Sequence, residues 1–174
     1  GIAHLVPALQ ALLASGREVQ VDIVGERVDD THFARLSTLL EAWPDSVKWH
    51  GFLPAAEVDA LMRAADIFVA PSTYESFGLI YVEAQRYGLP SVAFAAGGVP
   101  EVVTDGADGL LAPLGNDHAL FQALARLVDD AGLRRRLSEG ARASYEARFG
   151  VGQVAERLEQ VYRDVAVKGA RHGR

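Results

Sequence analysis

The chain has 174 residues, of which 49% are hydrophobic, carries a formal net charge of −6 and contains no cysteine. The length and apolar content indicate one globular domain with a real core, and they exclude a disordered or collagen-like chain. The acidic balance argues against general nucleic-acid binding, the lack of cysteine excludes disulfides and thiolate metal sites, and no apolar run reaches the ~18 residues that span a bilayer.

The predicted elements alternate along the chain. From apolar spacing and from Gly and Pro stop signals, helices are expected over residues 1–13, 30–43, 55–65, 77–87, 100–104, 117–129, 133–148 and 151–167. Strands are expected over residues 19–24, 47–49, 66–70, 91–95 and 109–112. No predicted strand precedes the first helix, and the pattern beyond Asp130 is entirely helical.

Apolar strands that alternate with helices predict a doubly wound α/β fold, with helices on both faces of a parallel sheet, followed by C-terminal helices. In such sheets ligands bind at the carboxyl ends of the strands. The loops that follow predicted strands are Gly25-Glu26, Gly51-Phe52, Ser72–Gly78 and Gly97-Gly98. We therefore expect the functional site at the edge where these loops meet.

The most informative stretch runs from Pro71 to Glu83 and reads PSTYESFGLIYVE. Its Ser76-Phe77-Gly78 segment opens a predicted helix, whose first N–H groups lack internal partners and whose dipole favours an anion such as phosphate. Gly78 has no Cβ, so an anion could approach the backbone closely. The turn alone favours a simpler interpretation, in which Ser76 caps the helix.

Two carboxylates flank that turn. Glu75 and Glu83 are eight positions apart, slightly more than two helical turns, and are expected to project from roughly the same side of one helix. A nucleotide sugar would explain carboxylates beside a phosphate turn, because a carboxylate accepts hydrogen bonds from the vicinal hydroxyls of ribose or of a sugar. By spacing alone, two ordinary surface glutamates are the simpler interpretation.

This stretch, with its E-x7-E from Glu75 to Glu83, resembles the donor-site signature of the retaining, GT-B-type glycosyltransferases of family 4, or group 1. Five further segments are similar to motifs of that family and occur in the same order: VDIVG, WHGFLP, GLP, AGGVPEV and DGADGLLAP. The resemblance runs from Gly1 to about Phe149. It implies two Rossmann-like domains with the active site between them, of which this chain resembles only the C-terminal, donor-binding one.

The resemblance also implies residue roles. Glu83 would bind the ribose hydroxyls, and Glu75, the one candidate catalytic residue, would contact hydroxyls of the transferred sugar and position it. The main chain near Phe52 would meet the base, and Gly25 would leave room near the phosphates. The diphosphate and sugar would be held by backbone groups of Ser76, Phe77, Gly78 and Leu79. The five histidines are scattered without ligand spacing, and no metal or cofactor is expected besides the nucleotide-sugar substrate.

The resemblance predicts the domain organisation as well. Residues 1–150 would form the Rossmann-like nucleotide-sugar-binding domain without its first strand, and residues 151–174 a C-terminal helix and tail that pack on an N-terminal acceptor domain absent from this chain. An Arg and a Lys that usually precede the residue resembling Gly1 are missing too, as is an initiator Met. We therefore expect a fragment that transfers no sugar alone. Gln85-Arg86-Tyr87 replaces the small residues common before Gly88.

The expected function is donor binding in the transfer of a hexosyl group with retention, the acceptor attacking on the face that the leaving phosphate vacates. Two alternatives stay open: half of a GT-B-like nucleotide-sugar epimerase, and a noncatalytic α/β binding or assembly module. In the latter, an apolar stripe on the last helix could mediate dimerisation. That stripe consists of Val154, Leu158, Val161 and Tyr162.

The expected partners are a nucleotide sugar and the acceptor domain, without nucleic acid. The residues Gly1-Ile2-Ala3-His4 do not resemble a signal peptide, and the expected location is the cytoplasm. Arg134-Arg135-Arg136 and the tail Lys168–Arg174 would allow peripheral contact with an anionic inner membrane face. The simpler interpretations are a solvated helix face for the first cluster and a frayed end for the second.

Overall fold

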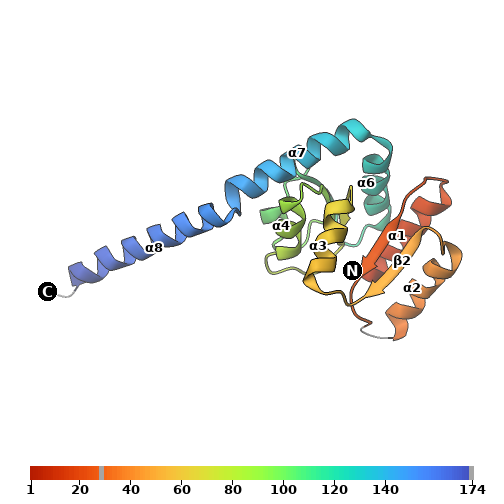
Figure 1. Ribbon diagram of the computed structural model, residues 1–174, viewed down its shortest axis with the longest axis horizontal. Helices are drawn as coiled ribbons and strands as arrows, with labels where there is room; N and C mark the ends of the chain where they lie inside the picture. Colours follow the sequence, from red (N-terminus) through yellow and green to blue (C-terminus); the bar gives the residue numbers. More distant parts are fainter. Residues whose placement is uncertain (28–29, 173–174) are drawn as a thin grey trace.

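A computed structural model describes residues 1–27 and 30–172, with side chains described as far as Val165 (Figure 1). The helices are α1 (Ile2–Ala14), α2 (Asp30–Ala42), α3 (Ala55–Ala64), α4 (Leu79–Arg86), α5 (Val99–Val102), α6 (Asp117–Asp129), α7 (Ala131–Arg148) and α8 (Val151–His172). The strands are β1 (Val21–Val24), β2 (Val47–Gly51), β3 (Phe68–Val69), β4 (Ser91–Phe94) and β5 (Gly109–Ala112). Every predicted helix and strand is present, with ends shifted by a few residues.

All strand pairs are parallel. β1 pairs with β2, and β3, β4 and β5 pair in that order. The doubly wound α/β class is confirmed, but the sheet is divided in two, since no ladder joins β1 to β3 in the described part of the chain.

The central strand β4 shows why helices cover both faces. Successive side chains of a strand point to opposite faces. Val92 and Phe94 belong to the larger core cluster, which includes apolar residues of α1, α2 and α6. Ala93 belongs to the second cluster, with Tyr81 of α4 and Val102 of α5. All four residues of β4 are buried, as expected for a parallel strand covered on both sides.

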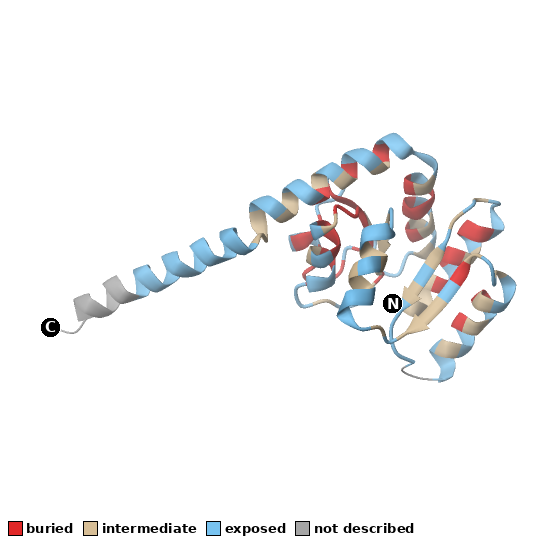
Figure 2. Ribbon diagram, viewed as in Figure 1, coloured by how far each residue is buried: buried red, intermediate tan, exposed pale blue. Residues whose placement is uncertain are grey.

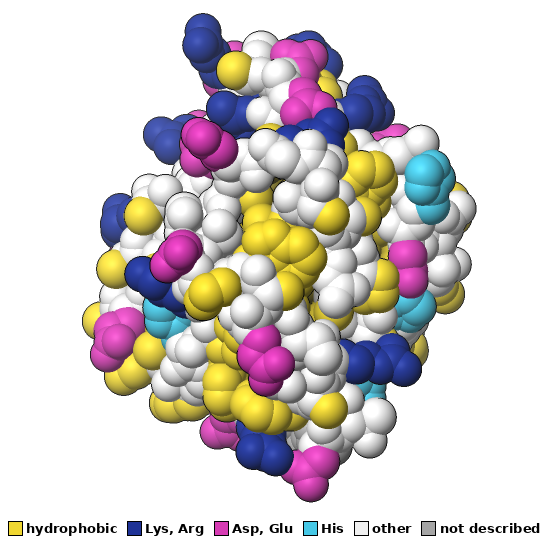
Figure 3. All heavy atoms as spheres, turned by 90° about the vertical axis from the view of Figure 1, so that its right-hand side faces the viewer, with side chains coloured by type: hydrophobic (Ala, Val, Ile, Leu, Met, Phe, Trp, Pro, Cys, Tyr) yellow, Lys and Arg dark blue, Asp and Glu magenta, His cyan; other side chains and the backbone are white. Residues whose placement is uncertain are grey.

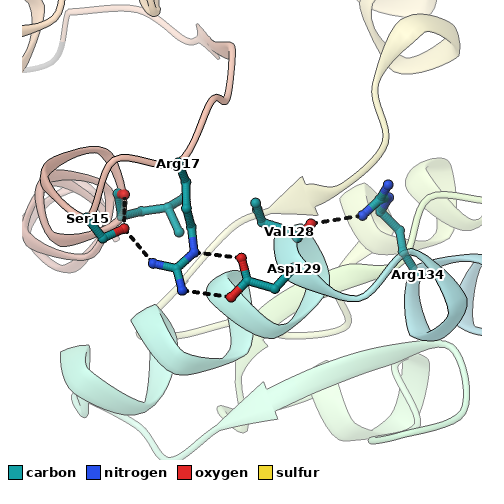
Figure 4. Close-up of polar contacts among 6 residues, drawn as sticks. Ser15, Arg17, Val128, Asp129 and Arg134 are labelled. Atoms are coloured by element: carbon teal, nitrogen blue, oxygen red, sulfur yellow. Dashed lines mark hydrogen bonds and ion pairs between the residues drawn. The ribbon is translucent and has the colours of Figure 1, made fainter.

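Polar contacts join the end of α1 to the end of α6, and the end of α6 to the start of α7 (Figure 4). Arg17, just after α1, donates two hydrogen bonds to the carboxylate of Asp129 at the end of α6, with N···O distances of 2.8 and 2.7 Å. These hydrogen bonds hold the pKa of Asp129 below its ordinary value. Arg134, in the first turn of α7, donates to the main-chain oxygens of Leu127 and Val128, and Figure 4 shows the contact with Val128. Arg134 therefore caps the end of α6 and is not part of a solvated cluster, whereas Arg135 and Arg136 are exposed as predicted.

The last helix stands apart from the core. α8 projects away from the α/β body, and each of its side chains up to Val165 is exposed (Figures 1 and 2). The predicted apolar stripe on this helix is exposed to between 51% and 66%. The side chains of Lys168–Arg174 lie outside the described residues. Among the described helices, none is long and apolar enough to cross a membrane. The end of the molecule opposite α8 shows hydrophobic side chains gathered near its middle (Figure 3).

Candidate functional site

Apolar side chains are exposed at the carboxyl ends of the strands. Outside α8, the large hydrophobic side chains exposed among the described residues are Val24, Phe52, Tyr74, Phe77, Leu79, Ile80 and Leu114. Each lies at the end of a strand, in the loop that follows it, or in the first turn of the next helix. Gathered exposed apolar side chains mark interaction or ligand surfaces. This feature is not among those predicted from the sequence, although apolar residues in glycine-rich loops could have indicated it.

The loop after β3, residues 71–78, is held against the loop after β4. We call the first of these the β3–α4 loop. The N–H of Gly98 donates to the main-chain oxygen of Glu75 at 2.8 Å. A Cβ on Gly97 would lie 2.2 Å from that same oxygen, and one on Gly98 would lie 2.6 Å from the main-chain oxygen of Ser76. Glycines at both positions therefore let the two main chains touch.

The N-terminus of α4 is free of a side-chain cap. The helix begins at Leu79, and its N-cap residue is Gly78 with φ 93° and ψ 50°. The interpretation of Ser76 as the helix cap is wrong, because Ser76 lies two residues before that position. A Cβ on Gly78 would lie 2.7 Å from the ring of Tyr81, so both conformation and space require glycine here. The first N–H groups of α4 therefore have no side-chain cap, and uncapped helix N-termini are common anion sites.

Glu75 lies in the β3–α4 loop and not on α4, so the argument that two helical turns place it beside Glu83 is wrong. Its side chain is partly buried, and Ser72 Oγ donates a hydrogen bond to Glu75 Oε1 at 3.1 Å. Glu83 is exposed in the second turn of α4. Neither carboxylate pairs with a cation among the residues that the structure describes.

Tyr81 packs between α4 and the end of β3, beneath the main chain of the β3–α4 loop. Its side chain is fully buried and reaches from α4 to the end of β3, where its hydroxyl donates to the main-chain oxygen of Ala70 at 2.6 Å. Its ring packs edge-on against Phe68, with 5.9 Å between centroids. Burial raises the pKa of Tyr81, and the charge of Glu75 acts in the same direction, whereas hydrogen bonding with Ser72 opposes the rise. In the sequence this tyrosine looks like one more apolar helix position.

The junction between α7 and α8 also contacts this loop. The rings of Phe77 and Phe149 meet edge-on, with 6.1 Å between centroids. The guanidinium of Arg148 lies 4.6 Å from the centroid of the Phe149 ring and donates to the main-chain oxygens of Glu101 and Val102. The point from which α8 projects is thereby fastened to both the β3–α4 loop and α5.

Gly25 and Phe52 lie together at the end of the other sheet. The N–H of Gly25 donates to the main-chain oxygen of Gly51 at 2.9 Å, and the indole N–H of Trp49 donates to the oxygen of Gly25 at 3.1 Å. A Cβ on Gly25 would meet nothing within 4 Å, and Phe52 is 72% exposed. No hydrogen bond or ring contact is recorded between this pair and the β3–α4 loop in residues 1–27 and 30–172.

The predicted site residues thus form two groups. One consists of Glu75, Ser76, Phe77, Gly78, Leu79 and Glu83 around the start of α4. The other is Gly25 with Phe52. Within the described residues, no group of three or more His, Asp or Glu side chains is placed to hold a metal ion. His4 and His50 each bond one carboxylate, those of Asp117 and Asp22.

Two cavities lie away from the β3–α4 loop. One of about 500 Å³ lies beside β5 and α6, next to the Arg17–Asp129 pair. The other, of about 460 Å³, is lined by Arg63, Arg86, Tyr87, Arg142, Tyr145 and Glu146.

The residues that replace the small ones expected before Gly88 have a packing role. Gln85 is buried and its Nε2 donates to the main-chain oxygen of Val102, and the Tyr87 hydroxyl donates to the carboxylate of Asp59.

A parallel α/β body with an uncapped, glycine-started helix at the carboxyl edge of its strands is a Rossmann-like domain, and domains of this class bind their ligands at that edge. The chain belongs to the family described as glycosyl transferases group 1, whose model matches residues 1–144. The family resemblance drawn from the sequence is therefore confirmed.

Individual relatives agree. The D-inositol 3-phosphate glycosyltransferase of Corynebacterium glutamicum is 41% identical over 111 residues, which are 64% of this chain and 26% of that protein. Sucrose-phosphate synthase from Thermosynechococcus elongatus superposes with a TM-score of 0.80 at 30% identity, over 97% of this chain and 43% of that one. Anabaena HepE, solved with UDP and glucose, superposes with a TM-score of 0.78 at 25% identity, over 93% and 44%. The chain thus spans about a quarter of the length of the curated relative and less than half of these solved structures.

Proposed function

We propose that this chain binds a nucleoside-diphosphate sugar and is the donor-binding part of a retaining glycosyltransferase that transfers a hexosyl group. The observation that carries the proposal is the start of α4. There, a helix N-terminus without a side-chain cap follows a left-handed glycine, next to a partly buried carboxylate and at the ligand edge of a Rossmann-like domain. UDP bound in the structurally similar HepE supports this ligand class.

The proposed roles are those that the family resemblance implies. The diphosphate takes the N–H groups at the start of α4, within the stretch of Ser76, Phe77, Gly78 and Leu79. Glu83 accepts hydrogen bonds from the ribose hydroxyls, and Glu75 from hydroxyls of the sugar. Phe52 contacts the base through its main chain, and Gly25, which has open space on its Cβ side, leaves room near the phosphates. In this proposal, the residues around the start of α4 and the pair Gly25 and Phe52 contact different parts of the same nucleotide sugar.

In this proposal, these residues promote departure of the diphosphate. The N–H groups and the dipole of α4 stabilise the negative charge that develops on the leaving phosphate. Glu75 holds the sugar ring, and the acceptor attacks on the face that the diphosphate vacates, which retains the anomeric configuration. No metal ion or additional cofactor takes part.

The rest of the catalytic site would come from an N-terminal acceptor domain. Two observations support this part of the proposal: the relatives are much longer than this chain, and the apolar stripe of α8 is exposed. Residues 1–174 alone should therefore bind donor without transferring sugar. Release of nucleoside diphosphate in the presence of sugar acceptors, above the rate without protein, would contradict this expectation.

The site assignment is tested by calorimetric titration of the chain with UDP-glucose, GDP-mannose and ADP-glucose. We expect one of them to bind, and Glu83→Ala to weaken that binding about tenfold or more, because hydrogen bonds to a charged group are worth about 1.5–3 kcal/mol. The matched control is Glu139→Ala, which removes an exposed glutamate on α7 and should leave affinity unchanged. Absence of binding at millimolar concentration, or full affinity in Glu83→Ala, would refute the assignment.

A further inference from the structure

The side chain of Glu75 has a single recorded hydrogen bond in the described structure, donated by Ser72 Oγ to Oε1 at 3.1 Å. A serine hydroxyl has one hydrogen to donate, and here it is directed at the carboxylate. Oε2 has no recorded partner and is left for a ligand. The main-chain contact from Gly98 fixes the backbone of Glu75, but it does not set the direction of the carboxylate.

Ser72 is in turn held by a buried group. The main-chain N–H of Ser72 donates to the Tyr81 hydroxyl oxygen. The single proton of that hydroxyl is directed at the main-chain oxygen of Ala70, at 2.6 Å, so the Tyr81 oxygen acts toward Ser72 as an acceptor. A series of contacts therefore runs from the end of β3 through Tyr81 and Ser72 to the carboxylate of Glu75.

The anchor of this series is rigid. Tyr81 is fully buried, with its ring between Phe68 and Gly78. Close-packed interiors hold side chains in one rotamer, and a functional carboxylate must be held to within a fraction of an ångström by the groups behind it. Tyr81 supplies such support from α4, and Ser72 carries it to Glu75 within the β3–α4 loop.

We propose that Ser72 and Tyr81 are positioning residues that aim the Glu75 carboxylate at the hydroxyls of the donor sugar. Tyr81 is buried and acts only through Ser72. The inference rests on the proposed function and goes beyond it in one respect: the pair controls how strongly the sugar half of the donor is bound, and not the nucleotide half.

The test compares two ligands on each variant: the nucleotide sugar that binds tightest among UDP-glucose, GDP-mannose and ADP-glucose, and the same nucleoside diphosphate without the sugar. The quantity of interest is the ratio of their dissociation constants, diphosphate over nucleotide sugar. We expect Ser72→Ala to lower this ratio about three- to tenfold, the size of one ordinary hydrogen bond. The dissociation constant for the diphosphate should stay within about twofold, since the start of α4 is unchanged.

Three further variants sharpen the test. Ser72→Thr keeps the hydroxyl and should restore the ratio. Tyr81→Phe keeps the ring and should lower the ratio in the same direction as Ser72→Ala. Ser72→Ala combined with Glu75→Gln should lower the ratio no further than Glu75→Gln alone, because the serine acts through the glutamate. Tyr145→Phe, which removes a hydroxyl from α7, is the control and should change nothing.

The outcomes separate the two proposals. If none of the three nucleotide sugars binds the unmodified chain, the proposed function fails and the positioning role fails with it. If a nucleotide sugar binds but Ser72→Ala leaves the ratio unchanged, the positioning role alone is overturned. It is overturned equally if Ser72→Ala weakens both ligands to the same extent, because a residue that only supports the fold would act on both. Ser72 is partly exposed, so its replacement should not prevent folding.

Discussion

The N–H of Gly98 donates a hydrogen bond of 2.8 Å to the main-chain oxygen of Glu75. This contact joins the loop after β4 to the β3–α4 loop. It occupies the main-chain oxygen of Glu75 and leaves the carboxylate of that residue free to bond other groups. The shape of the proposed sugar site therefore depends on a glycine pair that follows a different strand. Contact between two main chains is possible only where no Cβ intervenes.

Gly97→Ala should damage both the fold and donor binding. A Cβ there would lie 2.2 Å from the oxygen of Glu75, and the residue has φ 52°, so the β3–α4 loop must move. We expect a loss of about 2–4 kcal/mol in the free energy of unfolding, combining overpacking with the left-handed conformation. Urea unfolding and calorimetry with the nucleotide sugar measure the two effects.

Gly115→Ala is the matched control, because Gly115 has φ 75° but nothing within 4 Å of a Cβ. It should cost only about 1–2 kcal/mol, from the conformation alone, and leave donor affinity unchanged. Equal destabilisation by the two substitutions would show that the contact between the loops adds nothing.

The contact of Phe77 with Phe149 should couple the β3–α4 loop to the α7–α8 junction. The two rings meet edge-on with 6.1 Å between centroids, and such pairs are worth about 0.5–1.5 kcal/mol beyond the area that they bury. A double-mutant cycle with Phe77→Ala and Phe149→Ala should return a coupling free energy of that size in urea unfolding. Tyr162→Ala, on the exposed face of α8, should show none with Phe77→Ala; equal coupling in both cycles would disprove a specific contact.

The sequence predicted the elements well because apolar periodicity and glycine and proline breaks are local signals. It predicted that residues 75–79 and Glu83 lie together because an apolar strand, a glycine-containing turn and a helix follow one another there in the sequence. It failed on Glu75, which was given helical geometry although α4 begins four residues later, at Leu79. The helix cannot begin before Gly78, because Gly78 has a left-handed conformation and packs against the Tyr81 ring. Both features depend on tertiary packing, which the local sequence pattern does not show. The roles of Ser72, Tyr81 and Phe149 depend on contacts across the fold, for which the sequence carries no local signal.

Asp108 should make stability fall as pH rises. The residue is 2% exposed, and burial raises the pKa of its carboxyl group, although the hydrogen bond from the N–H of Thr104 at 2.7 Å opposes the rise. A folded pKa above the unfolded value of about 3.9 means that the folded state holds the proton more tightly. Its stabilising contribution is therefore complete below the unfolded pKa and is lost as pH rises through the folded pKa.

Asp108→Asn keeps an acceptor oxygen and removes this titration. Between about pH 3 and about pH 7, the free energy of unfolding of the variant should improve relative to the unmodified chain. Asp129→Asn should behave in the opposite way, because Arg17 lowers the pKa of Asp129 and the stability gained from that pair is lost as pH falls. Chemical unfolding at several pH values measures both, and parallel curves for Asp108→Asn and the unmodified chain would rule out its titration as a cause.

The exposure of α8 leads to a final contrast between two leucines. Leu137 of α7 is fully buried, whereas Leu158 of α8 is 51% exposed. Leu137→Ala should cost about 2–5 kcal/mol through lost burial and a cavity. Leu158→Glu should change the free energy of unfolding by no more than about 0.5 kcal/mol, when it is measured at low protein concentration so that association does not contribute. A Leu158→Glu variant as unstable as Leu137→Ala would mean that, in solution, α8 folds back onto the α/β body instead of projecting from it.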